Sequence, residues 1–272
     1  MDPLQTAKRA VRRFWEDAPC GVERALAAEG SREWFAEIER RREEQEPFIA
    51  EFAEFASSGG KAVLEIGVGV GTDHVRFARA GAKLHGVDLT ERAVALVRRR
   101  LELEGLSSDL RVADAEALPF ADDSFDVVYS WGVLHHTPDT AHAVAEAVRV
   151  ARPGARVCIM VYSRHAWVSY GLWLRRGPLA GRPTRSLADV LAHHMESPGT
   201  KGFTERELRA MLDGVSDLRI DKLATPYDRA YAGPLAAATG RWLGFFQVAR
   251  GRKRAAATVA RREPGNARYL RL

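Results

Sequence analysis

Three glycines and a carboxylate stand close together in this sequence and could hold a nucleoside. Gly67, Gly69 and Gly71 alternate with valine directly after the apolar residues 62–64. Glycine permits the tight bend and the close approach of a ligand that such a site requires. A second short apolar segment ends at Asp88, whose carboxylate could accept hydrogen bonds from two vicinal ribose hydroxyls. The pattern predicts a nucleoside-binding crevice at the ends of two strands.

The spacing of the glycines discriminates between two kinds of ligand. A dinucleotide-binding loop follows the pattern G-x-G-x-x-G, but Thr72 stands where that pattern needs its third glycine. With Glu65 included, the segment reads E-x-G-x-G-x-G and resembles motif I of the class I S-adenosylmethionine-dependent methyltransferases. In that family the loop faces the methionine part of the cofactor. The resemblance therefore implies S-adenosylmethionine as the cofactor and this loop, with Glu65, as part of its site.

Further segments match the same family in its order along the chain, over residues 60–163. The resemblance implies that Asp88, with Leu89, holds the ribose, and that Asp114, with Ala115, accepts a hydrogen bond from the adenine amino group. It also implies a cofactor contact for Ser130. Segments 117–128, 134–136 and 152–155 resemble the approach to the fourth strand, the L-H-H turn after it, and the entry to the fifth strand.

Two histidines, His135 and His136, follow the fourth strand, beside the expected position of the cofactor's sulfonium group. Methyl transfer requires donor and acceptor to be held in line, and an alcohol or ammonium acceptor must also lose a proton. Imidazole titrates near neutral pH. Both are candidate catalytic residues, as a general base or as groups that orient the acceptor, and His136 is slightly favoured. The alternative is that they only bond backbone groups.

Candidate substrate contacts come from other segments. Trp15 lies in residues 14–21, which resemble the W-x-x-x-P-C-G segment of some bacterial methyltransferases whose first helices close over the cofactor; simple packing is the alternative. Tyr162 ends the fifth strand, and His193 and Glu196 lie in a long irregular stretch.

A metal site at His193, His194 and Glu196 is disfavoured. Zinc requires three or four ligands, and no further Cys or His group with suitable spacing stands nearby. We therefore expect no metal.

The elements that position these residues alternate between strand and helix patterns. This alternation predicts an α/β fold, a doubly wound, mostly parallel, seven-stranded Rossmann-like sheet, in which ligands bind beyond the carboxyl ends of the strands. Helices are expected at 7–17 and 31–45 and from Pro47 onward, and the last two strands at 216–225 and 242–249, the second antiparallel as the resemblance implies.

Five parts are expected along the chain. Forty residues without a clear strand, 164–203, are too many for a simple connection and predict an inserted cap that selects the substrate. The parts are a helical N-terminal lid (1–58), the cofactor-binding core (59–163), the cap (164–203), the completion of the core (204–252) and a basic tail (253–272).

Composition limits the partners and the location. A chain of 272 residues with 46% hydrophobic residues can bury one good core. No stretch approaches the length of a membrane span, and the N-terminus has no apolar signal region. Two cysteines cannot build a disulfide framework. We expect a cytoplasmic protein without membrane contact, as a monomer or a homodimer.

The net charge of +5 raises the possibility of a nucleic-acid partner, but only residues 250–262 form a basic run, so this partner is disfavoured. Our interpretation is methyl transfer to the O, N, C or S atom of a small-molecule acceptor. The alternatives are an RNA methyltransferase that uses the basic tail, an NAD(P)-binding Rossmann reductase, and a cofactor-binding protein that has lost catalysis.

Overall fold

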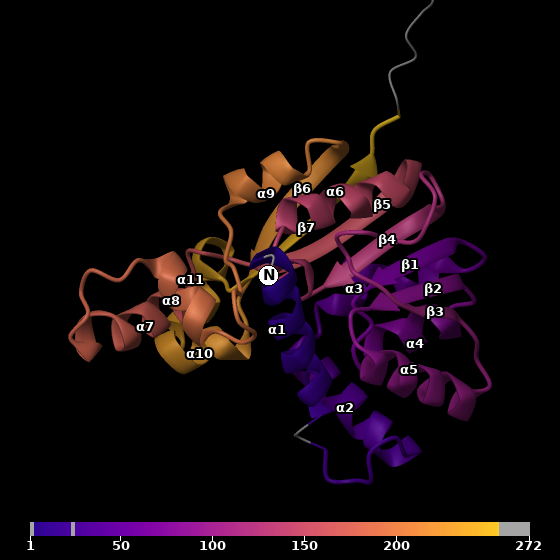
Figure 1. Cartoon of the computed structure of the whole chain (residues 1–272), viewed down its shortest axis with the longest axis horizontal. Coiled ribbons are helices and arrows are strands. Elements are labelled where there is room, and N and C mark those ends of the chain that lie inside the picture. Colours follow the sequence, from indigo (N-terminus) through magenta and orange to yellow (C-terminus); the bar gives the residue numbers. More distant parts are fainter. Residues whose placement is uncertain (1–2, 23–24, 256–272) are drawn as a thin grey trace, which may run out of the picture.

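The computed structural model describes residues 3–22 and 25–255. Seven strands form one sheet: β1 (Ala62–Ile66), β2 (Lys83–Asp88), β3 (Asp109–Val112), β4 (Phe125–Trp131), β5 (Ala151–Tyr162), β6 (Val215–Leu223) and β7 (Phe246–Lys253). Their order is β3-β2-β1-β4-β5-β7-β6, and only β7 runs antiparallel to its neighbours (Figure 1). The predicted doubly wound, mostly parallel sheet is confirmed.

Helices cover both faces of the sheet (Figure 1). One face carries α3 (Ile49–Ala53), α4 (Thr72–Arg79) and α5 (Glu91–Glu104), and the other carries α6 (Thr140–Val150) and α9 (Glu205–Met211). Outside the first layer, α2 (Arg32–Gln45) packs on α4 and α5. The two faces follow from the alternation of side chains along each strand.

Two adjacent pairs of strand residues illustrate this alternation. Tyr129 and Met160 are buried in the cluster under α3 and α4, whereas Val128 and Ile159 are buried in the cluster under α6. Nearly continuous apolar strands are typical of parallel sheets covered on both faces. The sheet is therefore a rigid base for whatever its carboxyl edge holds.

The N-terminal helices begin close to where the sequence predicts them. The first, α1, covers Pro3–Asp17, and α2 starts after Ser31, whose side chain accepts a hydrogen bond from the Trp34 N–H. Such a serine cap stabilises a helix start by about 1 kcal/mol. The apolar stripe that begins at Phe48 packs against the sheet through contacts of Phe52 with Tyr129 and Trp131.

The segment predicted to form a cap is helical, and helices from later in the chain pack with it. Residues 164–203 contain α7 (Trp167–Arg176), the short 3-10 helix η4 (Pro178–Ala180) and α8 (Leu187–His194). Two later helices, α10 (Pro226–Ala232) and α11 (Leu235–Leu243), join them beside the sheet, at the left of Figure 1. The sequence analysis did not assign α10 and α11 to this part because they follow β6, a strand of the core sheet.

Two predicted strand boundaries were wrong in this region. Thr225 does not end β6 but caps α10, where its side chain and that of Asp228 form a capping box. Trp242 lies in α11 rather than in the last strand, because the helical pattern continues to Leu243 and ends at Gly244. The strand β7 therefore starts at Phe246.

The basic run that starts at Arg250 begins inside the sheet. Arg250 and Arg252 lie inside β7, and Lys253 ends that strand. Arg250 pairs with Glu54, and the Lys253 ammonium lies 2.6 Å from Asp123. Residues 256–272 lie outside the described residues. Among the helices that the structure describes, none has the length and apolar character needed to cross a bilayer.

Candidate functional site

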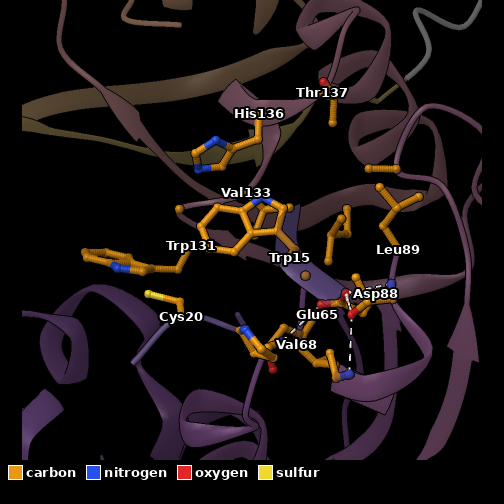
Figure 2. A pocket seen from close by; sticks show the side chains of 18 of the residues that line it. Trp15, Cys20, Glu65, Val68, Asp88, Leu89, Trp131, Val133, His136 and Thr137 are labelled. Atoms are coloured by element: carbon orange, nitrogen blue, oxygen red, sulfur yellow. Dashed lines mark hydrogen bonds between the residues drawn. The ribbon is translucent and has the colours of Figure 1, made fainter. Parts of the chain in front are cut away.

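A cavity opens at the carboxyl ends of the central strands, where α1 crosses them (Figure 2). The glycine loop after β1 and the end of β2 form one part of its wall, and the segment after β4 forms another. Eleven of the predicted site residues line it: Trp15, Glu65, Gly67, Gly69, Asp88, Leu89, Asp114, Ala115, His136, Tyr162 and Glu196. The structure thus brings most of the predicted site together.

Four predicted site residues do not line the cavity. Ser130 is fully buried in the sheet and donates to the Ile66 carbonyl, so it is not available to a cofactor. His193 lies on α8, with 63% of its side chain exposed, and bonds the Asp189 carbonyl. His135 is fully buried behind Tyr162, with ring centroids 3.9 Å apart. Gly71, the fourth, has a structural role described next.

The three glycines of the loop have different tasks. All have positive φ, at +82° for Gly67, +53° for Gly69 and +77° for Gly71, a region that disfavours side chains. A Cβ on Gly67 would lie 2.1 Å from a Val133 methyl, whereas one on Gly69 would meet nothing within 4 Å. Gly71 caps α4 and packs near Val97, so it shapes the helix start rather than the cavity.

This difference predicts unequal effects of two alanine substitutions on stability. Gly67→Ala should lower the free energy of unfolding by about 2–5 kcal/mol, from backbone strain and the clash with Val133. Gly69→Ala is the matched control and should cost only about 1–2 kcal/mol, from backbone strain alone. Urea unfolding of both variants measures this, and equal losses would contradict the assignment of the Val133 contact.

Asp88 is held in place by the loop that it faces. Its Oδ2 accepts a hydrogen bond from the Gly69 N–H at 3.1 Å, and its Oδ1 accepts from the N–H and the hydroxyl of Thr90 at 3.0 and 2.8 Å. Burial raises the pKa of Asp88, and these hydrogen bonds partly oppose that rise. The carboxylate is therefore oriented before any ligand arrives, and it keeps free acceptor capacity.

Asp114 has a partner that the sequence did not suggest. Lys8, on α1, places its ammonium 2.6 Å from both Asp114 Oδ2 and Glu116 Oε2. Lys8, Val11 and Trp15 all line the cavity, and their spacing of three and four residues puts them on one helix face. That spacing is the signal that could have identified Lys8, and it shows how α1 covers the crevice.

Glu65 and His74 form a buried pair beneath the glycine loop. Glu65 Oε2 lies 2.9 Å from Nδ1 of His74, and Nε2 of His74 lies 2.9 Å from the Ser108 hydroxyl. Because that hydroxyl donates to the Leu84 carbonyl, it accepts from Nε2–H. Burial lowers the pKa of His74 to about 3 and raises the pKa of Glu65 well above its usual value. The ring is therefore neutral, its Nδ1 is an acceptor, and the proton between the two groups lies on the Glu65 carboxyl.

The Glu65–His74 pair predicts how the free energy of unfolding depends on pH, and Glu65→Gln should change this dependence. The ordinary pKa values of Glu65 and His74 are 4.5 and 6.5. Between pH 4.5 and pH 6.5, these two side chains together hold one titratable proton in the folded protein and also one in the unfolded chain. Above pH 6.5 only the folded pair keeps its proton, and the free energy of unfolding falls by up to about 1.4 kcal/mol per pH unit. Below pH 4.5 the unfolded pair holds one proton more, and stability falls again.

In Glu65→Gln the amide can still donate to His74, but the residue no longer titrates. The contribution of the pair should then be constant above pH 6.5 and should start to fall at pH 6.5 on acidification, because only His74 remains. Urea unfolding of both proteins from pH 4 to 8.5 tests this. Parallel profiles would contradict the protonated state of Glu65.

Arg42 brings a partly buried positive charge to the cavity wall. Its Nη2 donates to Asp73 at 3.0 Å, and its Nε lies 3.6 Å from Glu46 but has no hydrogen-bond partner among the described residues. Burial opposes its charge, but the two carboxylates raise its pKa further, so the guanidinium stays protonated. The Thr72 hydroxyl, also on the wall, is buried without a partner. Nothing local in the arginine-rich helix distinguished Arg42.

His136, Tyr162 and Glu196 form a polar group at another part of the wall. The Tyr162 hydroxyl donates to Glu196 Oε2 at 2.8 Å, and His136 Nε2 lies 3.4 Å from the same oxygen. Burial raises the pKa of Glu196, but these two neighbours outweigh it and lower the pKa below its usual value. The Trp15 ring packs edge-on at 5.0 Å from His136. Figure 2 shows His136 and Asp88 in different parts of the cavity wall.

Two hydroxyls after α8 fix the orientation of His136. Thr200 Oγ1 donates to the Ser197 carbonyl at 2.7 Å and lies 3.0 Å from Nδ1 of His136. Its proton is thus used, so it accepts from Nδ1–H, which assigns the tautomer. The Ser197 hydroxyl lies 2.9 Å from the same nitrogen. Nε2, on the opposite side of the ring, is directed toward the Glu196 side of the cavity.

Comparisons with known proteins show what the chain is similar to. Residues 64–159 match the sequence model of the family described as "Methyltransferase domain". The methyltransferase GfsG of Streptomyces halstedii is 38% identical over 105 residues, which are 38% of this chain and 38% of that protein. The ubiquinone biosynthesis O-methyltransferase of Hahella chejuensis is 36% identical over 135 residues, 48% of this chain and 57% of that protein. The chain thus spans less than two thirds of the length of these relatives.

One solved structure shares the architecture over a larger part of this chain than these sequence matches cover. The magnesium protoporphyrin IX methyltransferase from Synechocystis PCC 6803 superposes with a TM-score of 0.60 at 17% identity, over 91% of this chain and 99% of that chain. At this identity the comparison establishes the fold.

Proposed function

We propose that this protein, whose residues 64–159 match the family described as "Methyltransferase domain", is a class I S-adenosylmethionine-dependent methyltransferase and transfers a methyl group to a small-molecule acceptor. The observation that carries the proposal is that one cavity contains both the Gly69 and Asp88 wall and the polar group of His136, Tyr162 and Glu196. A nucleoside-type donor and an acceptor can meet in such a cavity, with α1 excluding water from above.

The residues of the cavity fit the cofactor along its length. S-adenosylmethionine supplies the methyl group as a sulfonium ion. We assign the ribose hydroxyls to Asp88 and the adenine amino group to Asp114. Arg42 Nε and Thr72 Oγ1, both buried without partners, are suited to bind a carboxylate, and we assign the methionine carboxylate to them. The open space beside Gly69 leaves room for the ligand at the loop.

The acceptor end is assigned to His136, Tyr162 and Glu196. His136 Nε2 can accept a hydrogen bond from an acceptor hydroxyl and so direct the oxygen lone pair into the cavity. Trp15, Trp131 and other aromatic side chains of the wall favour a planar, partly apolar acceptor. The name of the Hahella relative, an O-methyltransferase, supports oxygen as the accepting atom.

Calorimetry tests the cofactor assignment. We expect S-adenosylhomocysteine and S-adenosylmethionine to bind the purified protein with a single-site isotherm, and NADPH to bind much more weakly or not at all. Tighter binding of NADPH would replace the proposal by a reductase. Binding of the methyl donor without any transfer across a panel of phenolic and alcoholic acceptors would favour a protein without catalysis.

An RNA acceptor is the weaker candidate. The basic residues of β7 are used within the protein, since Arg250 pairs with Glu54 and Lys253 with Asp123. Binding to RNA that falls steeply with salt would nevertheless support this alternative. A chain truncated after residue 255 with unchanged activity would argue against it.

A further inference from the structure

Two neighbouring histidines have ring nitrogens that the fold leaves unsatisfied. His135 is completely buried, and neither of its ring nitrogens has a hydrogen-bond partner among the described residues. His136 is 5% exposed, and its Nε2 is likewise without a partner. A buried polar atom without a partner costs about 1–3 kcal/mol, so such groups require an explanation, for which an absent ion is one candidate.

A carboxylate completes the group. Glu196, two residues beyond α8, places Oε2 3.4 Å from Nε2 of His136. One ligand atom from each of His135, His136 and Glu196 lies within 4.8 Å of the others. A tetrahedral zinc ion with bonds of about 2.1 Å holds its ligand atoms about 3.4 Å apart. The His136–Glu196 pair already has this spacing, and a small movement of the His135 ring would bring the third ligand in.

The surroundings resemble the outer shell of a metal site. Metal-binding histidines are usually oriented by a hydrogen bond from their second ring nitrogen, and here Nδ1–H of His136 donates to Thr200. Metal-binding carboxylates are usually hydrogen-bonded as well, and here the Tyr162 hydroxyl donates to Glu196. The Trp15 ring shields His136. Two of the three ligands, His136 and Glu196, are thus oriented before an ion binds.

We propose that His135, His136 and Glu196 bind a divalent transition-metal ion, with an open coordination position toward the cavity. Two imidazoles and a carboxylate suit zinc and its neighbours, whereas magnesium prefers sites made of oxygen ligands. The sequence led us to expect no metal because the metal site considered there combined Glu196 with the adjacent His193 and His194. The fold instead joins Glu196 to the histidines that follow β4.

The chemical role of the ion rests on the proposed function. The open position takes the acceptor oxygen, and the ion replaces the direct hydrogen bond between His136 and the acceptor. A hydroxyl bound to such an ion has a lowered pKa. Loss of the O–H proton to water would leave the oxygen with the electron pair that forms the new O–C bond. The S–C bond of the sulfonium would break in the same displacement, and its electron pair would leave with sulfur as neutral S-adenosylhomocysteine.

Metal binding is measured on the full chain after treatment with a chelator and dialysis. Titration with Co²⁺ should give the visible absorption bands of a four- or five-coordinate site, and calorimetry with Zn²⁺ should give a single site. Glu196→Gln, which keeps the side-chain shape, should weaken Zn²⁺ binding by at least about tenfold. His193→Gln is the matched control, because this exposed histidine lies close in sequence but outside the cluster, and it should bind Zn²⁺ like the wild type.

Urea unfolding of Glu196→Gln, compared with the wild type, shows whether this variant has a folding defect. A second variant tests the site independently of that outcome. Thr200→Val removes the hydroxyl that accepts from His136 and donates to the Ser197 carbonyl, and it should weaken Zn²⁺ binding by about 10-fold. Absence of the Co²⁺ bands, equal Zn²⁺ affinity in wild type and Glu196→Gln, or binding of Mg²⁺ alone would each overturn the proposal.

A parallel measurement separates this proposal from the proposed function. S-adenosylhomocysteine should bind the metal-free protein, because Asp88 and the glycine loop contain none of the ligands. Methyl transfer should fall after chelation and return with Zn²⁺ or Co²⁺. Full activity in the chelated protein would overturn the metal site alone, whereas loss of S-adenosylhomocysteine binding in the metal-loaded wild type would overturn the methyltransferase assignment.

Discussion

Replacing Asp88 with alanine should weaken the binding of S-adenosylhomocysteine by roughly 2–4 kcal/mol, about 30- to 900-fold. The ribose hydroxyls would lose an ionised acceptor, and the Gly69 and Thr90 groups that Asp88 now binds would lose their partner. Calorimetry on the wild type and the variant measures the change.

A matched variant shows how much of this loss comes from the loop rather than from the ligand. Asp88→Asn keeps the size of the side chain but cannot accept hydrogen bonds on both of its terminal atoms, so an intermediate loss is expected. Leu89 also lines the cavity but offers no polar side chain, and Leu89→Met should bind almost normally. Near-normal affinity in Asp88→Ala would mean that the nucleoside lies elsewhere.

Replacing His136 with alanine should lower kcat by about 100-fold or more and leave the affinity for S-adenosylhomocysteine unchanged. The reason is position: Nε2 of His136 faces the cavity beside Glu196, away from the loop that holds the nucleoside. The effect is expected whether His136 contacts the acceptor directly or through a bound ion. Steady-state kinetics with an acceptor that the wild type methylates, and calorimetry with S-adenosylhomocysteine, measure the two quantities.

The control for this substitution is His142→Ala. His142 is exposed near the start of α6, away from the cavity, and its loss should change kcat by less than about threefold. A loss below threefold in His136→Ala as well would remove this residue from the chemistry. A parallel fall in cofactor affinity would instead point to a disturbed cavity.

The doubly wound, mostly parallel sheet and the position of the glycine loop were accessible from the sequence. Alternating apolar and glycine-rich segments depend on neighbours a few residues apart, and the glycines of the loop, Asp88 and Asp114 follow their strands directly. In a parallel sheet the carboxyl ends of the strands share one edge. Local pattern was therefore sufficient to place these residues in one crevice.

Some residues lie elsewhere in the structure than their sequence context suggested, because their residue types occur both on surfaces and in the interior. Ser130 sits at a family position but faces the sheet interior, where it bonds the Ile66 carbonyl. His193 stands close to Glu196 in sequence but lies on an exposed helix face. Trp242 continued an apolar run that belonged to a helix. Direction and burial in these cases depend on packing that the local sequence does not encode.

The sequence by itself determined the sheet, the glycine loop and the carboxylates at its edge, because these depend on short-range periodicity and backbone geometry. Only the tertiary structure decided that Lys8 meets Asp114 across 106 positions and that His136 meets Thr200 across 64. It also decided that Glu196 completes a group with the two histidines after β4. Such contacts depend on how the helices pack over the sheet, and the spacing of residues along the chain does not predict them.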